Sequence, residues 1–484
     1  MSTDETIEPT LSASADPSVD EHVDPALASS ADHSADDDYP VRLLRTVIAA
    51  IIVFSSSMTI VSASLPTMAD DLDTSESFLA WSVTGLFLVM AVGTPVLGRL
   101  GDVIGHRKVF IAGAVVLSIG TVLCGLAPNA LGFVIARMIT GAGIAGTLPT
   151  GTALIMNAYS VEERPRAMGW FQMAMTGAPV IGLVVGGPLI EAFGWRTLFA
   201  VLAPISFVGV ALAWRVIRPT PPVGDRTIDW WGAASLGVAT LSFLLFLERG
   251  SSAGFGDPLA LGLLLLSAVS LRWFVWVERR VDDPMLKLGY LRRRNFAGPL
   301  IAQPLSQFAY MGSFLIAPLL LDERFGYSVN AIALILLCRP AVYSISSPVG
   351  GRLATRIGER PMIIAGSVLI VASMLVWIPG TMWESVPFII LALSLSGLAM
   401  GLASPSYSTA LAGSVDDGDL GVANGMGTTT MNIGMLTGIQ SMFVILGEGR
   451  DPSDFARTFA FGAVVAAFGL IGALMIRARP AATA

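Results

Sequence analysis

The chain has 484 residues, of which 54% are hydrophobic and only 13% are charged, and its mean hydropathy is +0.70. Roughly a quarter of the residues in a soluble globular domain are charged, so this composition excludes that class and indicates a protein of the lipid bilayer. The two cysteines, Cys124 and Cys338, both lie in apolar runs, so the sequence indicates neither a disulfide framework nor a thiolate metal site, and it leaves the redox compartment open.

The first forty residues form an acidic tail with eleven Asp and Glu residues and no Lys or Arg. The net charge of −7 is therefore misleading, because the rest of the chain carries 29 bases against 25 acids. The tail is poor in large apolar residues and buries too little surface to offset the entropy of ordering. We expect residues 1–40 to be a disordered cytoplasmic tail, with partner binding as the alternative, and not a signal peptide.

Fourteen apolar stretches follow the tail, each close to the length of about twenty residues with which a helix crosses the hydrocarbon core. They are 41–64, 77–97, 109–127, 131–155, 167–190, 197–217, 229–247, 257–277, 296–321, 328–350, 361–379, 385–412, 420–446 and 457–477. The sequence therefore predicts an all-α integral membrane protein with 14 transmembrane helices.

The basic residues orient these spans. If the N-terminus is cytoplasmic, 22 of the 29 Lys and Arg residues lie in cytoplasmic segments, five lie in outer loops, and Arg137 and Arg339 lie within spans. Cytoplasmic loops carry an excess of Lys and Arg, so we expect both termini on the cytoplasmic side of an inner membrane. Segment 413–419 is an exception, because it is expected to be cytoplasmic but has no Lys or Arg. Its charged residues are the acids Asp416, Asp417 and Asp419, which we expect to cap the next helix.

A charge-dense bend occurs twice, as GRLGDVIGHRKVF at 98–110 and as GRLATRIGERPMI at 351–363. Each copy follows a predicted span, the second and the tenth. If the tenth span is the second helix of a repeat, each half has six helices, and the seventh and eighth spans are an insertion. This predicts bundles at 41–218 and 296–484, with two inserted helices and a cytoplasmic linker at 219–295. Such duplication is the expected build of a secondary transporter.

Three motifs carry a family resemblance. They are Gly98, Arg99, Leu100, Asp102, Gly105, Arg107 and Lys108 in the first bend; Arg137, Gly141, Gly143 and Gly146 in the fourth span; and Gly177, Gly182, Gly186 and Gly187 in the fifth. With SLPTMADDL at 64–72 and FGWRTLF at 193–199, they resemble the major facilitator superfamily, in its fourteen-helix drug:proton antiporter branch. The resemblance covers nearly everything after residue 40 and implies the major facilitator fold.

The bend at Gly98–Lys108 is a predicted conformational latch made of Gly98, Asp102, Gly105 and Arg107. Its glycines allow a tight reversal and a close approach of two helices, and Asp102 is placed to meet a positive helix N-terminus. The resemblance implies that this N-terminus starts near residue 420 and that Arg107 holds Asp102 in place. An ordinary positive-inside turn with an ion pair is the alternative. Thr355 replaces the acid in the second copy, so we expect only one charged latch.

The fifth span is a predicted helix-packing motif, since Gly177, Gly182, Gly186 and Gly187 permit close contact between helices. It departs from the branch pattern, because Leu183 stands where the motif has proline. This change weakens the assignment of export.

Two arginines within spans, Arg137 and Arg339, are candidates for coupling or substrate binding, because an ionisable residue in a membrane is costly. The resemblance ties Arg137 to proton coupling, and a structural role for either arginine is the alternative. Ser57 stands where the branch commonly has an aspartate, and no Asp or Glu lies deep in any span. Asp102 and Glu191 stay as candidate proton carriers.

A cavity between the halves is expected to be lined by uncharged polar and aromatic side chains. The candidates are Gln303, Gln307, Tyr310, Asn424 and Asn432, together with Trp81, Gln172, Tyr407 and Gln440. Such walls suit a bulky amphiphilic small molecule, and two arginines without acids favour an anionic or carbonyl-bearing group.

No catalytic residues, metal site or cofactor are expected, because two of the three histidines lie in the tail and no phosphate-binding glycine loop occurs. The sequence predicts an exporter of drug-like or lipophilic molecules that works by alternating access and proton antiport, driven by a proton gradient. An importer or uncoupled facilitator of the same fold is the alternative, and a membrane enzyme or scaffold is a third class. We expect a monomer with a small-molecule substrate, protons and lipid as partners and no nucleic acid.

Overall fold

The computed structural model describes residues 38–63, 65–79, 81–220, 229–281, 284, 287–447 and 449–477, and within helices it leaves out some side chains, among them those of 54–60 and 181–188. Contacts between Cα atoms separate Met1–Tyr39 from Pro40–Ala484, and the fold described below is that of the second unit. The predicted tail at 1–40 lies almost entirely outside the described residues.

The described residues form helices and no strand, which confirms the all-α prediction. The long helices are α2 (Tyr39–Ala63), α5 (Trp81–Ile104), α6 (His106–Leu126), α7 (Ala130–Ala158), α8 (Arg164–Phe193), α9 (Trp195–Val216), α10 (Trp230–Ala253), α11 (Pro258–Glu278), α12 (Arg294–Phe325), α13 (Val329–Ile357), α14 (Glu359–Met382), α15 (Val386–Ala412), α16 (Leu420–Leu446) and α17 (Pro452–Met475). Short helices α3 (Leu65–Asp71), α4 (Glu76–Leu79), η2 (Leu288–Arg292) and η3 (Asp417–Asp419) join them.

Each of the fourteen predicted spans coincides with one long helix. Over the described residues, twelve of these helices are long and apolar enough to cross a membrane. The other two, α2 and α8, have 25 and 30 residues and contain side chains outside the described part. The chain is therefore a multi-pass membrane protein.

The prediction of a loop at 98–108 is wrong. Helix α5 continues to Ile104, only Gly105 is non-helical, and α6 begins at His106. Gly105 has a φ of 100°, which favours glycine because it lacks a Cβ atom. Hydropathy marks the part of a helix that lies in hydrocarbon, and polar residues beyond it do not end the helix. The second copy repeats this geometry, with Gly358 at a φ of 87° between α13 and α14.

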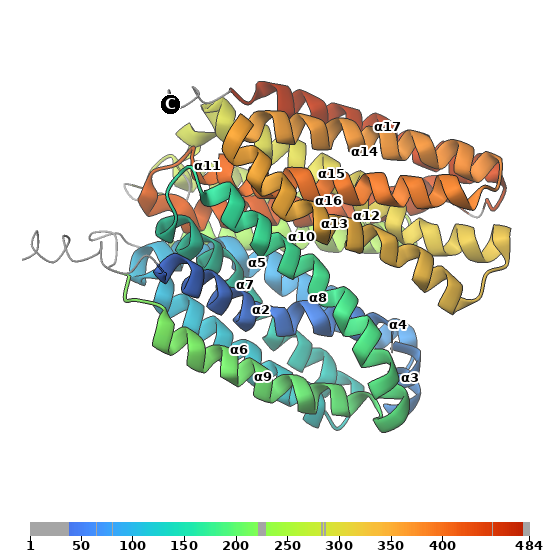
Figure 1. Cartoon of the computed structure of the whole chain (residues 1–484), viewed down its shortest axis with the longest axis horizontal. Helices are drawn as coiled ribbons and strands as arrows, with labels where there is room; N and C mark the ends of the chain where they lie inside the picture. The colour runs from blue at the N-terminus through green and yellow to red at the C-terminus, as the bar shows by residue number, and fades with distance from the viewer. Residues whose placement is uncertain are drawn as a thin grey trace, which may run out of the picture. The chain divides into compact units, whose positions relative to one another are not determined.

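The helix contacts follow a reciprocal pattern. In the first half, α5 packs on α7, and α6 packs on α7 and α9. In the second half, α14 packs on α15 and α17, and α12 packs on α16 and α17. Between these groups, α5 packs on α16 and α8 packs on α13. The second helix of each expected repeat thus contacts the fifth helix of the other, as a duplicated fold with a two-fold relation requires. Figure 1 shows these long helices running side by side.

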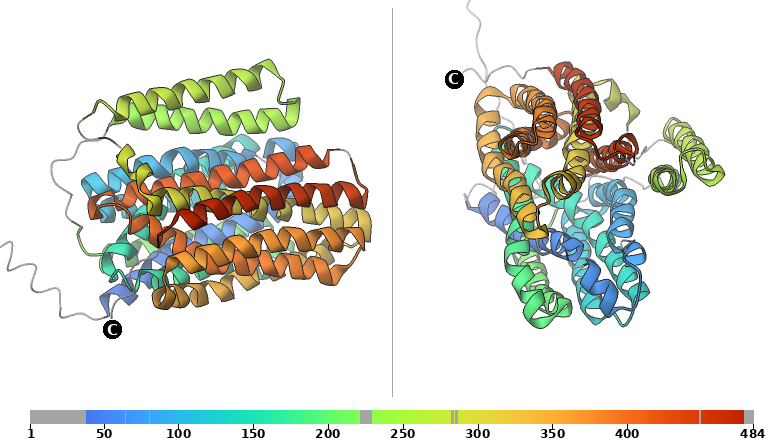
Figure 2. Two further views of the ribbon diagram at one scale, coloured as in Figure 1. Left: turned by 90° about the horizontal axis from the view of Figure 1, so that it is seen from above. Right: turned by 90° about the vertical axis from the view of Figure 1, so that its right-hand side faces the viewer.

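Helices α10 and α11 form a hairpin beside the other helices (Figure 2). They pack mainly on each other, and α10 also contacts α5. The Ser267 hydroxyl on α11 donates a hydrogen bond to the Ala239 carbonyl on α10, at 2.9 Å. Helix α10 thus lies against both helices of the α5–α16 pair, since it also contacts α16.

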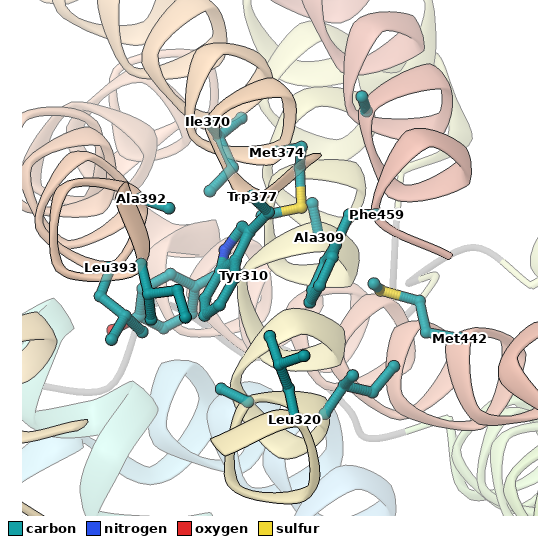
Figure 3. Packing of buried hydrophobic residues seen from close by; sticks show 14 of the residues in the cluster. Ala309, Tyr310, Leu320, Ile370, Met374, Trp377, Ala392, Leu393, Met442 and Phe459 are labelled. Atoms are coloured by element: carbon teal, nitrogen blue, oxygen red, sulfur yellow. The ribbon is translucent and has the colours of Figure 1, made fainter. Parts of the chain in front are cut away.

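An aromatic core fixes the helix that carries Tyr310. The rings of Trp377 on α14 and Phe459 on α17 stack with centroids 4.6 Å apart, and Met374 and Met442 lie around them (Figure 3). A ring pair of this kind contributes about 0.5–1.5 kcal/mol beyond the burial of its area. Since Tyr310 belongs to the same cluster, its position on α12 depends on packing from five other helices, α13 to α17.

Candidate functional site: a closed end and two cavities

Asp102 caps a helix that is more than 300 residues away in the chain. One carboxylate oxygen accepts the backbone N–H of Gly421 at 2.8 Å, and the other accepts that of Val422 at 3.1 Å. Both donors belong to the first turn of α16, where the N–H groups have no partner within the helix and the helix dipole is positive. The side chain is buried, so this contact is screened little by water. It is the contact that the family resemblance implies.

Glycines allow α5 and α16 to meet backbone to backbone at this point. A Cβ atom on Gly98 would overlap the Gly421 carbonyl, and one on Gly421 would overlap the Gly98 carbonyl. Further along the interface, the Thr429 hydroxyl donates to the Ala91 carbonyl at 3.3 Å. We call the end of the molecule where these contacts lie the Asp102 end.

Arg107 does not hold Asp102, so that part of the predicted latch is wrong. Its guanidinium donates to the Trp214 carbonyl at 2.8 Å and lies over the Trp214 ring, next to the end of α9. The side chain that meets Asp102 is His106, whose Nε2 is 3.4 Å from a carboxylate oxygen. The turn at Gly105 causes the exchange, because it starts α6 at His106 and directs Arg107 toward α9.

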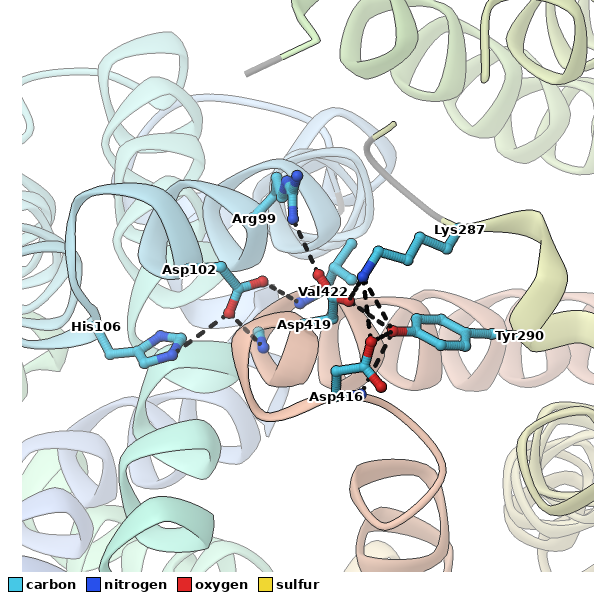
Figure 4. Close-up of polar contacts among 9 residues, drawn as sticks. Arg99, Asp102, His106, Lys287, Tyr290, Asp416, Asp419 and Val422 are labelled. Atoms are coloured by element: carbon cyan, nitrogen blue, oxygen red, sulfur yellow. Dashed lines mark hydrogen bonds and ion pairs between the residues drawn. The ribbon is translucent and has the colours of Figure 1, made fainter. Parts of the chain in front are cut away.

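Asp419 joins α5 to the linker that precedes α12 (Figure 4). One of its carboxylate oxygens accepts from Arg99 at 3.2 Å, and both side chains are buried. The other oxygen accepts from the Tyr290 hydroxyl at 2.6 Å and lies 2.8 Å from the Lys287 ammonium. Neighbouring Asp416 accepts from the same two linker groups, at 2.9 and 3.2 Å.

These contacts and burial shift the pKa values of the linker groups. Hydrogen bonding to Asp419 is the largest of several effects that together raise the pKa of Lys287, and burial raises the pKa of Tyr290 to about 12. Hydrogen bonds from Tyr290 and Lys287 lower the pKa of Asp416. At neutral pH Asp416 is therefore ionised, Lys287 is charged, and Tyr290 is a neutral phenol that donates.

The acids of segment 413–419 were expected to cap α16, and this expectation is wrong for Asp419. That residue is at the N-cap position, yet its side chain makes no capping hydrogen bond. Asp102 takes the free N–H groups instead, and Asp419 is turned toward Arg99 and the linker. Sequence reasoning missed Lys287 and Tyr290, because a linker shows no periodicity that reveals its partner.

A second close contact, between α8 and α13, lies at the same end. A Cβ atom on Gly351 would overlap the Pro165 carbonyl, and one on Gly169 would overlap the Ser347 carbonyl. Nearer the middle of both helices, the hydroxyls of Thr176 and Ser344 are 2.9 Å apart. In the second copy of the bend, Thr355 donates to Arg352 of its own helix, and it has no other partner within the part of the chain that the structure describes.

The predicted packing motif of α8 is described only in part. A Cβ atom on Gly177 would lie 3.3 Å from the Ser344 hydroxyl, which agrees with a role in close packing. Gly182, Gly186 and Gly187 lie in the same helix, but their surroundings are outside the described residues.

Two adjoining cavities lie between the helix groups. The smaller, of about 280 Å³, is bounded by Gln172, Gln303, Gln307, Tyr310 and Asn424, and thus brings together several of the predicted residues. The larger, of about 640 Å³, lies among α8, α12 and α13 and has mostly apolar walls. Four residues border both: Met175, Thr176, Tyr310 and Met311. The larger volume is within the range of about 300–1,000 Å³ that is typical of small-molecule sites.

The other predicted site residues lie elsewhere. Arg339 borders the larger cavity, whereas Arg137 is fully buried in α7 and borders neither. Asn432 is buried in α16 and also borders neither cavity, and Tyr407 is buried 3.3 Å from the Ser306 hydroxyl. Ser57 lies in α2, and its side chain is outside the described residues.

Several cavity residues were missed, although the sequence held a signal for them. Phe314 and Pro318 follow Gln307 and Tyr310 on α12 at spacings of three and four residues, which places them on one helix face. Extending the face from the two predicted residues would have found them. Among the described residues, no group of three or more His, Cys, Asp or Glu side chains could hold a metal ion.

Comparisons with known proteins identify the family of this chain. The sequence model of the Major Facilitator Superfamily matches residues 46–294 and 300–484. The uncharacterized MFS-type transporter YhcA of Bacillus subtilis is 28% identical over 69% of this chain and 63% of its own length. The multidrug resistance protein Stp of Mycobacterium tuberculosis is 28% identical over 84% of this chain and 75% of its own length.

A solved structure has the same fold. The crystal structure of the human organic anion transporter MFSD10 superposes with a TM-score of 0.61, covers 90% of this chain and 99% of its own, and is 15% identical. At this identity the likeness concerns the arrangement of the helices.

Proposed function

Because the chain belongs to the major facilitator superfamily, we propose that it exports drug-like or lipophilic small molecules across the cytoplasmic membrane by alternating access, driven by proton antiport. The relative named as a multidrug resistance protein supports export. The two cavities, which together resemble a small-molecule site, support a substrate of this size.

The observation that carries the proposal is the contact of Asp102 with α16. It joins the two helix groups at one end, while the larger cavity lies beside the halves of α12 and α13 that are far from that end. Since Lys and Arg cluster in the loops of the Asp102 end, we take that end to be cytoplasmic. In this proposal the structure is the outward-facing form, and export requires the Asp102 contact to break and form again.

Proton coupling is proposed to involve Asp102 and His106. No Asp or Glu lies deep in any span, so a proton carrier has to be found at a helix end. Asp102 is buried, meets His106, and loses its attraction to the N-terminus of α16 when it takes up a proton. Protonation would thereby favour opening of the cytoplasmic side.

An importer or uncoupled facilitator of the same fold is the second candidate. Ser57 in place of an aspartate and Leu183 in place of the motif proline favour it.

Uptake of lipophilic probes into everted membrane vesicles, with and without an imposed pH gradient, separates these candidates. Export by antiport predicts accumulation that collapses when an uncoupler is added. Equilibration that an uncoupler leaves unchanged supports the facilitator, and uptake in the reverse direction supports the importer. A complete lack of flux for neutral, anionic and cationic probes would contradict both candidates.

A further inference from the structure

Arg339 lies in the wall of the larger cavity, and no described carboxylate balances its charge. The side chain is 1% exposed and lies in α13 directly before Pro340. It donates one hydrogen bond, from a terminal nitrogen to the Tyr310 carbonyl. Its Nε and its other terminal nitrogen have no hydrogen-bond partner, and no carboxylate pairs with it, within the part of the chain that the structure describes. Burying a guanidinium is costly unless its N–H groups find acceptors, so this side chain can take a further acceptor in addition to those that the described residues supply.

Aromatic rings hold the guanidinium by its faces. Its central carbon is 3.2 Å from the centre of the Tyr310 ring and 4.6 Å from that of Phe314, one turn further along α12. Stacking of this kind satisfies the charge in part and leaves the N–H groups at the edge of the plane for hydrogen bonds. The backbone is fixed as well, because α15 approaches the Arg339 carbonyl at Gly397 so closely that a Cβ atom there would overlap it.

The polarity and charge of the other cavity walls favour one kind of ligand. Its walls are apolar apart from a few groups and include Val180, Leu336 and Pro318. Beyond Tyr310 the adjoining smaller cavity offers the amides of Gln303 and Gln307, and the Gln307 carbonyl oxygen has no partner in the described chain. Neither cavity has an acid in its described walls. A cationic molecule would therefore meet one buried positive charge and no negative one.

We propose that Arg339 is the anchor for an anionic group of the transported molecule, and that the substrates are amphiphilic organic anions. The apolar body of the substrate lies in the 640 Å³ cavity, and its carboxylate takes the free N–H groups of Arg339 after the Tyr310 or Phe314 ring turns aside. The inference rests on the proposed transport function and narrows it to one charge class. Arg137 has no part in this site, since it borders neither cavity.

The test compares three probes with one fluorophore: a dansyl-labelled aliphatic carboxylate, its methyl ester, and the matching trimethylammonium compound. Each is titrated against the full-length protein in nanodiscs, with empty nanodiscs as the blank. We expect the carboxylate to bind at least about tenfold more tightly than the ester, since charge-assisted hydrogen bonds are the stronger ones. We expect the ammonium compound to bind most weakly.

Arg339→Gln should remove this preference and leave binding of the ester within about twofold, which also shows that the variant is folded. Arg339→Lys should keep part of the preference. Arg356→Gln, which removes an exposed charge near the end of the same helix, is the matched control and should keep all of it. The inference is overturned if the wild type binds the ester or the ammonium compound as tightly as the carboxylate, or if Arg339→Gln retains the preference.

Flux of the same probes in proteoliposomes separates the two proposals. Binding that prefers the carboxylate, without flux of any probe, would support the anion site and overturn the transport function. Flux of the ester and the ammonium compound alone would support transport and overturn the anion site.

Discussion

Asp102 shows how one side chain takes its role from a distant element. Two backbone N–H groups of α16 hold its carboxylate, and the imidazole of His106 lies nearby. Removing its charge should therefore weaken the closed Asp102 end without changing α5 itself.

We expect Asp102→Asn to shift the protein toward a form that is open at the Asp102 end. Asparagine keeps one acceptor oxygen but presents a donor NH₂ to the second N–H group of α16, so one hydrogen bond to a charged group is lost. Such a hydrogen bond is worth about 1.5–3 kcal/mol. The ratio of open to closed forms should rise roughly tenfold or more. The measurement is maleimide labelling of Ser408→Cys, which borders the smaller cavity, in a chain without Cys124 and Cys338.

Asp257→Asn is the control for this prediction. Asp257 also accepts a backbone N–H at a helix N-terminus, that of Ala260 in α11, but it lies outside the interface. It should leave the labelling rate unchanged. An Asp102→Asn protein that labels as slowly as the wild type would refute the latch.

The contact of the linker with η3 should not depend on pH near neutrality. The folded pKa of Asp416 is below its ordinary 3.8, so its contribution is present above about pH 4 and is lost as the pH falls through that lower value. The folded pKa of Lys287 is above 10.5, so its contribution is complete below about pH 10.5 and is lost as the pH rises through the higher value.

Amide hydrogen exchange of Tyr290 and Arg293, corrected for the intrinsic rate, should show constant protection between about pH 5 and pH 9. Asp416→Asn should remove the loss of protection at acid pH. A transition between pH 6 and pH 7 would contradict this assignment of the linker contact to Lys287 and Asp416.

At the scale of the helices, the interface between α5 and α16 depends on the lack of side chains at two positions. Gly98 and Gly421 face each other, and a Cβ atom on either would overlap the other's carbonyl. The close approach is also what brings Asp102 within hydrogen-bond distance of the first turn of α16.

Gly98→Ala should force α5 and α16 apart. Overpacking of this kind costs about 1–3 kcal/mol, and we expect a lower melting temperature and faster labelling of Ser408→Cys. Gly262→Ala in α11 is the control, because the space around that glycine is open. It should stabilise its helix by roughly 0.5–1 kcal/mol, since alanine is the better helix former. Equal melting temperatures for the two variants would argue against the close approach.

At the scale of the whole molecule, the two helix groups meet through two equivalent pairs, α5 with α16 and α8 with α13. Alternating access requires both pairs to separate at the Asp102 end. A covalent bond across one pair should therefore stop transport.

We expect Thr176→Cys with Ser344→Cys, in a chain without Cys124 and Cys338, to form a disulfide. The two hydroxyls are 2.9 Å apart, and an S–S bond of about 2.05 Å needs only a small adjustment. Oxidation should abolish vesicle uptake, and a reductant should restore it. Each single cysteine variant should be insensitive to oxidation. Full transport by the cross-linked protein would show that α8 and α13 do not separate.

The sequence by itself determined the membrane class, the fourteen long helices and the family. These features follow from local composition: apolar length sets where a helix lies in lipid, and the motifs around Asp102 and Arg137 are contiguous in the chain. It also identified Gln303, Gln307, Tyr310 and Asn424, because uncharged polar residues are rare enough in apolar helices to be noticed.

Only the tertiary structure decided which side chains meet. In the structure the neighbour of Asp102 is His106 and not Arg107. The side chain of Asp419 contacts Arg99 and the linker and does not cap α16. The tertiary structure also left Arg339 facing a cavity while Arg137 lies away from both. The contacts of Asp102 with α16 and of Asp419 with Arg99 join residues more than 300 positions apart, and their geometry depends on how closely the helix backbones approach, which no local pattern of residues encodes.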